Sequence, residues 1–280
     1  MSALAFGARL VEAVDRLGPL CAGVDPHPAL LEAWGLADDA DGLAGFADRC
    51  LDGFAGAVAV VKPQAAFFER HGAAGVAVLE RLLAGFASTP TLTLLDAKRG
   101  DIGSTMDGYA DAYLRVGAPL GADALTLSPY LGFGSLEPAL RAAAGAGRGV
   151  FVLARTSNPE GGSVQLAVTD GGRSVAQSMV DGAAARNAGT DCGDVGVVVG
   201  ATHDHGLDLS ALHGAVLVPG LGAQGATPAE IVERFAGTAG PVLPAAARSL
   251  LRAGPRPAAL REAARALSEE LAGLAAGAAG

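Results

Sequence analysis

The sequence predicts a single-domain α/β protein, a closed (β/α)8 TIM barrel, and three observations lead to that fold class. The 280 residues are enough for one large domain. Short apolar runs, typical of strands buried on both faces, recur at a spacing of about 30 residues. Longer segments with apolar residues at helical spacing lie between these runs. Strict alternation implies parallel strands joined by crossover helices, and eight such units favour a closed barrel.

Each predicted strand is a short run that is apolar on both faces and rich in β-branched residues. In chain order the predicted strands are Leu20–Val24, Ala57–Val61, Thr91–Leu95, Ala124–Leu127, Val150–Leu153, Val195–Val199, Ala215–Val218 and Pro241–Leu243. An open doubly wound sheet is the alternative architecture. It is disfavoured because no G-x-G-x-x-G motif follows the first run.

The helices are predicted from apolar residues spaced three and four apart. The clearest examples are Leu43 to Phe54, Val76 to Leu83 and Leu260 to Leu271. An amphipathic stretch after Met1, with charges at positions 9, 12 and 15, predicts a short N-terminal helix. The Ala/Gly-rich tail after Leu274 is expected to fray. No linker or shift in composition divides the chain, so residues 1–280 are predicted to form one domain.

Composition excludes several classes of protein. With 50% hydrophobic and 18% charged residues, the chain is not disordered. No apolar run approaches the roughly 20 residues of a membrane span. The net charge of −9 argues against nucleic acid as the main partner, because phosphate backbones demand a basic surface. The three cysteines, Cys21, Cys50 and Cys192, are odd in number and far apart. We therefore expect a reduced, cytoplasmic chain.

Four charged residues stand in or directly after apolar strands, where a merely polar loop would not place them. Because side chains alternate along a strand, Asp96 and Lys98 are expected on the same side. Lys62 ends the neighbouring strand, and Asp101 follows Lys98 across a glycine. Alternating signs offset much of the cost of burying these charges. Flanking acids would keep Lys98 protonated, as a proton donor rather than a Schiff-base nucleophile, which indicates protonation of a carbanion.

Two other interpretations of these charges remain open at this stage. They can form a buried ionic network that only closes the barrel, or Asp96 and Asp101 can bind a metal ion. Two adjacent cations argue against a divalent ion. A second weak metal signal, His203 and His205 around Asp204, has no third ligand and is expected to be a solvated loop.

The loop after the seventh strand and the residue after the eighth indicate an anion site. In such barrels these two loops often bind phosphate. Here the seventh loop reads P-G-L-G-A-Q-G over positions 219–225, and its glycines allow backbone amides to approach an anion. Arg248 follows the eighth strand, and its guanidinium suits phosphate oxygens. The alternative for Arg248 is a surface ion pair.

Several segments together resemble a known family. Residues 96–105 match the D-x-K-x-x-D-I-x-x-T signature of the orotidine 5′-phosphate decarboxylase family. The seventh loop is similar to that family's phosphate loop. The segments V-V-K-P-Q-A-A-F-F-E, L-S-P-Y-L-G and A-R-T-S-N-P-E-G resemble its longer bacterial branch (type 2). The resemblance extends over nearly the whole chain, from the first strand to the eighth.

The resemblance implies the last step of de novo pyrimidine synthesis, in which orotidine 5′-monophosphate gives uridine 5′-monophosphate and carbon dioxide. It implies no metal, no organic cofactor and a homodimer. Lys98 would protonate C6 of the pyrimidine beside Asp96, while Asp101 and Thr105 would reach into the partner subunit's site. The remaining positions that match the family's substrate contacts are Asp25 and Lys62 for the ribose, Ser157 for the pyrimidine, and Gln224 and Arg248 for the phosphate.

The sequence also departs from the family pattern. Ala247 stands where the shorter branch has a glycine before the arginine, which bears on a backbone contact to phosphate. The segment 161–171 is longer than a minimal fifth loop, and the sequence does not decide whether it is a lid. Two other functions stay open: a related barrel enzyme that acts on sugar phosphates with magnesium, and a nucleotide-binding regulator without activity.

Overall fold

The computed structural model describes residues 4–202, 204–222 and 225–272. Eight parallel strands form a closed barrel in sequence order, and the eighth pairs with the first. The strands are β1 (Cys21–Val24), β2 (Val60–Pro63), β3 (Leu92–Arg99), β4 (Ala124–Leu127), β5 (Gly149–Arg155), β6 (Val195–Val199), β7 (Val216–Pro219) and β8 (Val242–Ala246). The predicted TIM barrel is therefore confirmed.

Several strands run past the apolar runs that predict them, and in two of them the extension includes charged site residues. β2 was predicted over 57–61 and lies at Val60–Pro63, while β3 continues to Arg99 instead of ending at Leu95. Apolar character marks only the part of a strand that faces hydrocarbon on both sides. Backbone pairing carries both strands further, so the charged residues lie within the strands rather than after them.

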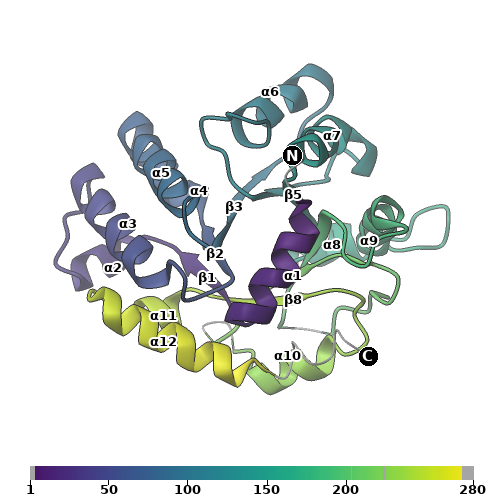
Figure 1. Cartoon of the computed structure of the whole chain (residues 1–280). Coiled ribbons are helices and arrows are strands. Elements are labelled where there is room, and N and C mark those ends of the chain that lie inside the picture. The colour runs from purple at the N-terminus through teal and green to yellow at the C-terminus, as the bar shows by residue number, and fades with distance from the viewer. Residues whose placement is uncertain (1–3, 203, 223–224, 273–280) are drawn as a thin grey trace.

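Most helices surround the barrel, and Figure 1 shows α1 lying across the end of the barrel instead. The helices are α1 (Phe6–Leu17), α2 (Pro28–Ala33), α3 (Ala40–Phe54), α4 (Ala65–Glu69), α5 (Gly72–Phe86), α6 (Gly103–Tyr113), α7 (Glu137–Ala146), α8 (Gly162–Gln165), α9 (Val175–Asn187), α10 (Pro228–Arg234), α11 (Arg248–Leu251) and α12 (Pro257–Glu270). The 3-10 turns Phe133–Leu136 and Pro159–Gly161 complete the list. The N-terminal helix and the three helices with the clearest spacing are confirmed. The tail from residue 273 lies outside the described residues.

The strict alternation of strand and helix is wrong at one connection. Between β6 and β7, the described residues 200–202 and 204–215 form turns and no helix. Leu209 and Leu212 of this connection are buried and cover the barrel where a helix would otherwise lie. Two buried leucines in a loop satisfy the same requirement for apolar cover that an amphipathic helix meets elsewhere.

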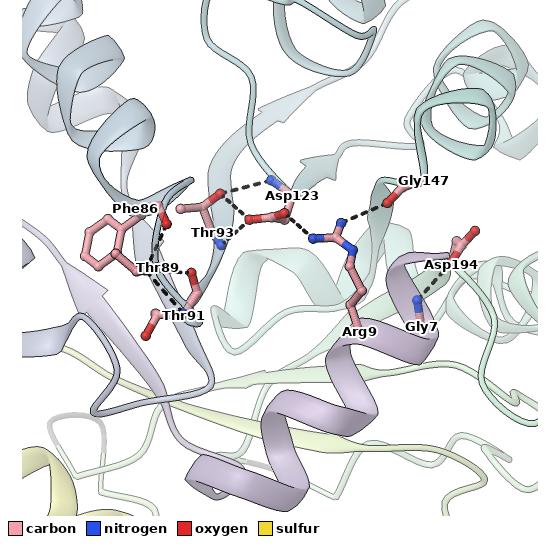
Figure 2. Close-up of polar contacts among 9 residues, drawn as sticks. All are labelled: Gly7, Arg9, Phe86, Thr89, Thr91, Thr93, Asp123, Gly147 and Asp194. Carbon is pink, nitrogen blue, oxygen red and sulfur yellow. Dashed lines mark hydrogen bonds and ion pairs between the residues drawn. The ribbon is translucent and has the colours of Figure 1, made fainter. Parts of the chain in front are cut away.

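The N-terminal helix α1 closes the end of the barrel where the strands begin. Phe6 is buried and meets Phe151 of β5 edge to face, with ring centroids 6.1 Å apart. Figure 2 shows Arg9 reaching from α1 to Asp123, which directly precedes β4. Arg9 Nη1 donates to Asp123 Oδ1 at 2.6 Å, and its Nη2 donates to the carbonyl of Gly147 at 2.8 Å. This end is a packed plug, which leaves the opposite rim for a ligand.

Three further properties bear on the sequence predictions. The three cysteines are free thiols. Burial raises the pKa of Cys21 to about 12 and that of Cys192 to about 11, so both stay protonated at neutral pH. Among the residues that the structure describes, no helix is long and apolar enough to cross a membrane. The cytoplasmic location stays a prediction.

The plug predicts a measurable contribution of Arg9 to stability. We expect Arg9→Met to lower the free energy of unfolding by about 1–3 kcal/mol, because Asp123 loses a charged partner. Urea denaturation followed by circular dichroism measures the change. Arg16→Met is the matched control, since Arg16 lies exposed on the same helix. If both variants unfold at the same urea concentration, the ion pair does not hold the plug.

Candidate active site

A cavity of about 330 Å³ opens at the rim where the strands end. Seven of the eight strands or the loops directly after them contribute to its wall; β4 alone does not. Six of the nine predicted site residues line it: Asp25, Lys62, Asp96, Lys98, Ser157 and Arg248. The carboxyl-end rim of a parallel barrel is where active sites of this fold lie, so the cavity is the candidate active site.

Asp96 stands between two lysines at the wall of the cavity, and these are the two lysines of the whole chain. Its Oδ2 lies 3.2 Å from Lys62 Nζ, and its Oδ1 lies 2.7 Å from Lys98 Nζ. The side chain of Lys62 is 8% exposed, whereas that of Lys98 is 45% exposed and faces the opening. Both lysines therefore border the cavity, Lys62 as the more buried and Lys98 as the more exposed of the two.

The predicted cluster of four charges has a different fourth member. Asp25, after β1, lies 4.0 Å from Lys62 Nζ, and its Oδ1 is buried without a hydrogen-bond partner among the described residues. Asp101 does not line the cavity; its Oδ1 accepts a hydrogen bond from the backbone of Ile102. The chain leaves β3 at Arg99 and turns into α6, and no ion pair joins Asp101 to Lys98 among the described residues. The alternating cluster is Asp25, Lys62, Asp96 and Lys98.

The opposite charges of the cluster stabilise one another's ionised forms. Burial raises the pKa of Asp96, but Lys62 and Lys98 outweigh it and lower that pKa from 3.8 to about 2. Burial lowers the pKa of Lys62, yet Asp25 and Asp96 outweigh it and raise that pKa above its usual value. At neutral pH, Asp96 is an anion and Lys62 a cation. A metal site built on Asp96 and Asp101 lacks support, because these two carboxylates do not converge within the chain.

The backbone of β3 is irregular at Lys98. Lys98 has a φ of 47°, a left-handed value that few residues other than glycine adopt. Its backbone N–H donates to Thr126 Oγ1 of β4 at 2.9 Å. The expectation that Asp96 and Lys98 share a side by strand alternation is wrong in its reason, since the two meet across a distortion of the strand. Thr126 was missed; a lone polar residue within an apolar strand was the available signal.

The loop after β5 carries Ser157 into the cavity and is held by the long segment that follows it. Gln165, at the end of the short helix α8, accepts a hydrogen bond from the backbone of Thr156 at 3.0 Å. Its Nε2 donates to Thr156 Oγ1 at 2.7 Å. The segment 161–171 thus supports the loop that carries Ser157, a contact that no sequence pattern indicates.

The anion site predicted at the seventh and eighth loops is partly described. Gly220 and Gly222 have φ values of 118° and 71°, so the loop after β7 needs glycine at both positions. Arg248 begins α11 at the cavity wall, and no carboxylate of the described residues lies within ion-pair distance of it. Ala247 has a φ of −123°, outside the left-handed region that favours glycine. Gln224 lies outside the described residues.

The loop after β6 differs from its prediction, because His205 is packed against the protein rather than solvated. His205 was expected to be solvated, but its ring packs on Phe235 with centroids 5.0 Å apart. Its Nδ1 accepts a hydrogen bond from the backbone of Leu207 at 3.0 Å. His205 therefore fixes the turn after β6. His203 lies outside the described residues, and within those described no group of three or more His, Cys, Asp or Glu side chains is placed to hold a metal ion.

Comparisons with known proteins agree with one another. Residues 18–263 match the model of the orotidine 5′-phosphate decarboxylase / HUMPS family. The orotidine 5′-phosphate decarboxylases of Salinispora arenicola and Salinispora tropica are 56% and 54% identical over 261 residues, which cover 92% of this chain and 94% of each relative. A crystal structure from Streptomyces avermitilis is 51% identical with a TM-score of 0.95, and the match covers 99% of this chain and 98% of that one. The chain therefore belongs to the orotidine 5′-phosphate decarboxylase / HUMPS family.

Proposed function

We propose that this chain converts orotidine 5′-monophosphate to uridine 5′-monophosphate and carbon dioxide, with Lys98 as the proton donor. The observation that carries the proposal is the half-exposed ammonium of Lys98 at the cavity wall, 2.7 Å from the buried carboxylate of Asp96. Relatives that share more than half of their residues with this chain carry the name of that activity. A protonated amine of fixed direction is the group that such a decarboxylation requires.

The chemistry follows from the cluster. The bond between C6 and the carboxylate breaks, carbon dioxide leaves, and the electron pair stays on C6 in the plane of the ring. The ammonium of Lys98 stabilises this developing charge, then transfers one proton to C6 and is protonated again from water. Asp96 remains ionised throughout, because Lys62 stays beside it after Lys98 has lost its proton. The buried lysine thus keeps the anion compensated during turnover.

The rest of the cavity fits a nucleotide monophosphate. The unpartnered oxygen of Asp25 and the ammonium of Lys62 suit ribose hydroxyls, which offer both donors and acceptors. Ser157 lines the cavity on the loop after β5 and suits the polar edge of the pyrimidine. Arg248 and the glycine turn at 220–222 suit the phosphate. Gln224 remains a predicted phosphate ligand.

Phosphate binding has a catalytic role in this proposal. The largest enzymatic accelerations correspond to roughly 20 kcal/mol, more than one lysine can supply. Binding energy from the remote phosphate can exclude water and hold C6 against Lys98. The anion site and the lysine cluster therefore act on the same substrate molecule from its two ends.

We further propose a homodimer in which Asp101 and Thr105 complete the partner subunit's site. Both lie outside their own cavity, and Thr105 is exposed. The neighbouring loops after β3 and β4 expose Ile102, Tyr130 and Leu131, which are 61%, 81% and 53% accessible. Exposed apolar side chains beside an unused catalytic carboxylate support an interface at this rim.

The activity is tested by adding orotidine 5′-monophosphate to the protein in EDTA and following ultraviolet absorbance as the orotate chromophore disappears. We expect turnover without metal. We expect Lys98→Ala to lower kcat by about 10²–10⁴-fold or more, because the proton donor is lost. Arg141→Ala removes an exposed cation of α7 and serves as the control. A Lys98→Ala variant with nearly normal kcat excludes the proton-donor role, and loss of wild-type activity in EDTA favours the magnesium-dependent class.

Arg248→Ala tests the anion site. We expect KM to rise by about 10- to 100-fold with a smaller fall in kcat, because a charged hydrogen bond to phosphate is lost. Arg252→Ala is the matched control, since Arg252 is exposed and directly follows α11. Steady-state kinetics with orotidine 5′-monophosphate and with orotidine measure the effect. If removal of the substrate phosphate weakens wild type and variant equally, Arg248 does not bind it.

Hybrid dimers test the shared site. We expect Asp101→Asn and Lys98→Ala homodimers to be nearly inactive, because each lacks one essential charge at every site. Mixing the two chains should restore activity, since a hybrid holds one site with both groups intact. The measurement is specific activity after mild denaturation and refolding of the mixture. Proven subunit exchange without recovered activity argues that Asp101 does not act across the interface.

A further inference from the structure

We infer that Thr126 of β4 is the positioning residue for the catalytic lysine, and this inference rests on the proposed function of Lys98. The hydroxyl of Thr126 contacts both the backbone of Lys98 and the carboxylate of Asp96. Thr126 does not line the cavity, so it acts through these two residues and not on the substrate.

The register of β3 against β4 is irregular around Lys98. Leu95 pairs with Leu125, and Arg99 pairs with Leu127. Between these pairs, three residues of β3 (96, 97 and 98) face a single residue of β4, which is Thr126. This is a bulge, a distortion that re-aims a side chain at the cost of ladder hydrogen bonds. The regular ladder resumes at once, because Ser128 N donates to the carbonyl of Arg99 at 2.7 Å.

Three hydrogen bonds form a closed ring that joins Lys98, Thr126 and Asp96. Lys98 N donates to Thr126 Oγ1 at 2.9 Å, and Thr126 Oγ1 donates to Asp96 Oδ1 at 2.9 Å. The same Asp96 oxygen accepts from Lys98 Nζ at 2.7 Å. Both ends of the lysine, its backbone amide and its ammonium, are therefore tied to one hydroxyl and one carboxylate. A hydroxyl has a single proton, so donating to the anion leaves its lone pairs for the amide.

This ring holds the backbone of Lys98 in an uncommon conformation. Lys98 has a φ of 47°, which persists in a non-glycine residue only where surrounding contacts hold it. Thr126 is fully buried, so water cannot replace its hydroxyl if it is removed. Without the hydroxyl, the backbone of Lys98 can relax and the long side chain regains rotamer freedom. The ammonium then no longer points at the reacting carbon.

The chain contains a matched control for this geometry. Thr93 Oγ1 donates to Asp123 Oδ2 at 3.0 Å and accepts from Asp123 N at 2.9 Å. It is buried like Thr126, but it lies at the plugged end of the same pair of strands, as Figure 2 shows. Thr93→Val and Thr126→Val each remove one buried hydroxyl that is bonded to one carboxylate and one backbone amide. Their cost to folding should be similar, and their effect on catalysis should differ.

The kinetic test compares Thr126→Val, Thr126→Ser and Thr93→Val. We expect Thr126→Val to lower kcat by about 10- to 100-fold with less than about a threefold change in KM, because the proton donor is misaligned while the binding groups remain. Thr126→Ser keeps the hydroxyl and should retain at least about half of the wild-type kcat, and Thr93→Val should keep all of it. If Thr126→Val fails to fold, Thr126→Ala removes the same hydroxyl without its bulk.

A second readout does not depend on activity. Labelling with ¹⁵N-lysine gives two backbone amide signals, from Lys62 and Lys98, because the chain has no other lysine. We expect the Lys98 amide to exchange with solvent at least about tenfold faster in Thr126→Val than in wild type and Thr93→Val, with the Lys62 signal as internal reference.

The two inferences fail in distinguishable ways. A wild-type chain that does not turn over orotidine 5′-monophosphate refutes the proposed function, whereas the exchange measurement still decides what Thr126 holds. Unchanged exchange at Lys98, unchanged kcat in Thr126→Val, or equal loss of kcat in Thr126→Val and Thr93→Val overturns the positioning role. A serine variant as impaired as the valine variant overturns it too, because the hydroxyl is then not the group that matters.

Discussion

The site depends on one buried carboxylate, that of Asp96, held between two lysines. A lone buried carboxylate would take up a proton, but the cations beside it keep it ionised and its pKa near 2. The anion in turn fixes the ammonium of Lys98 at the cavity wall while Lys62 stays buried behind it. Decarboxylation requires a proton donor that is held in one orientation, and the carboxylate of Asp96 holds the ammonium of Lys98.

The two ends of the barrel have different roles: one end is packed and stabilises the fold, and the other holds the candidate active site. At the end where the strands begin, α1 packs across the barrel and Arg9 forms an ion pair with Asp123. At the other end the strands open into the cavity. The seam between β3 and β4 carries a threonine–aspartate pair at each end, Thr93 with Asp123 and Thr126 with Asp96. The first pair ties β3 to the residue that precedes β4, whereas the second also holds the backbone amide of Lys98.

The chain belongs to the orotidine 5′-phosphate decarboxylase / HUMPS family, and its sequence left open a cofactor-independent decarboxylation and a magnesium-dependent reaction on sugar phosphates. The cluster within one subunit favours the former reaction, because the carboxylates of Asp25 and Asp96 are each paired with a lysine. This charge balance leaves the attraction for a divalent ion weak. Lys98 is the most exposed member of the cluster, and its side chain lies at the cavity wall.

The sequence by itself determined the barrel, because short apolar runs and segments of helical spacing are local patterns that survive distortion at single residues. It also determined which charges matter, since Lys62, Asp96 and Lys98 interrupt apolar strands. Only the tertiary structure decided how they meet. A β-bulge is stabilised by the neighbouring strand, so neither the left-handed Lys98 nor the role of Thr126 follows from spacing within β3. Asp25 replaced Asp101 in the cluster for a similar reason: β1 pairs in parallel with β2, which brings Asp25 beside Lys62 although the two are far apart along the chain.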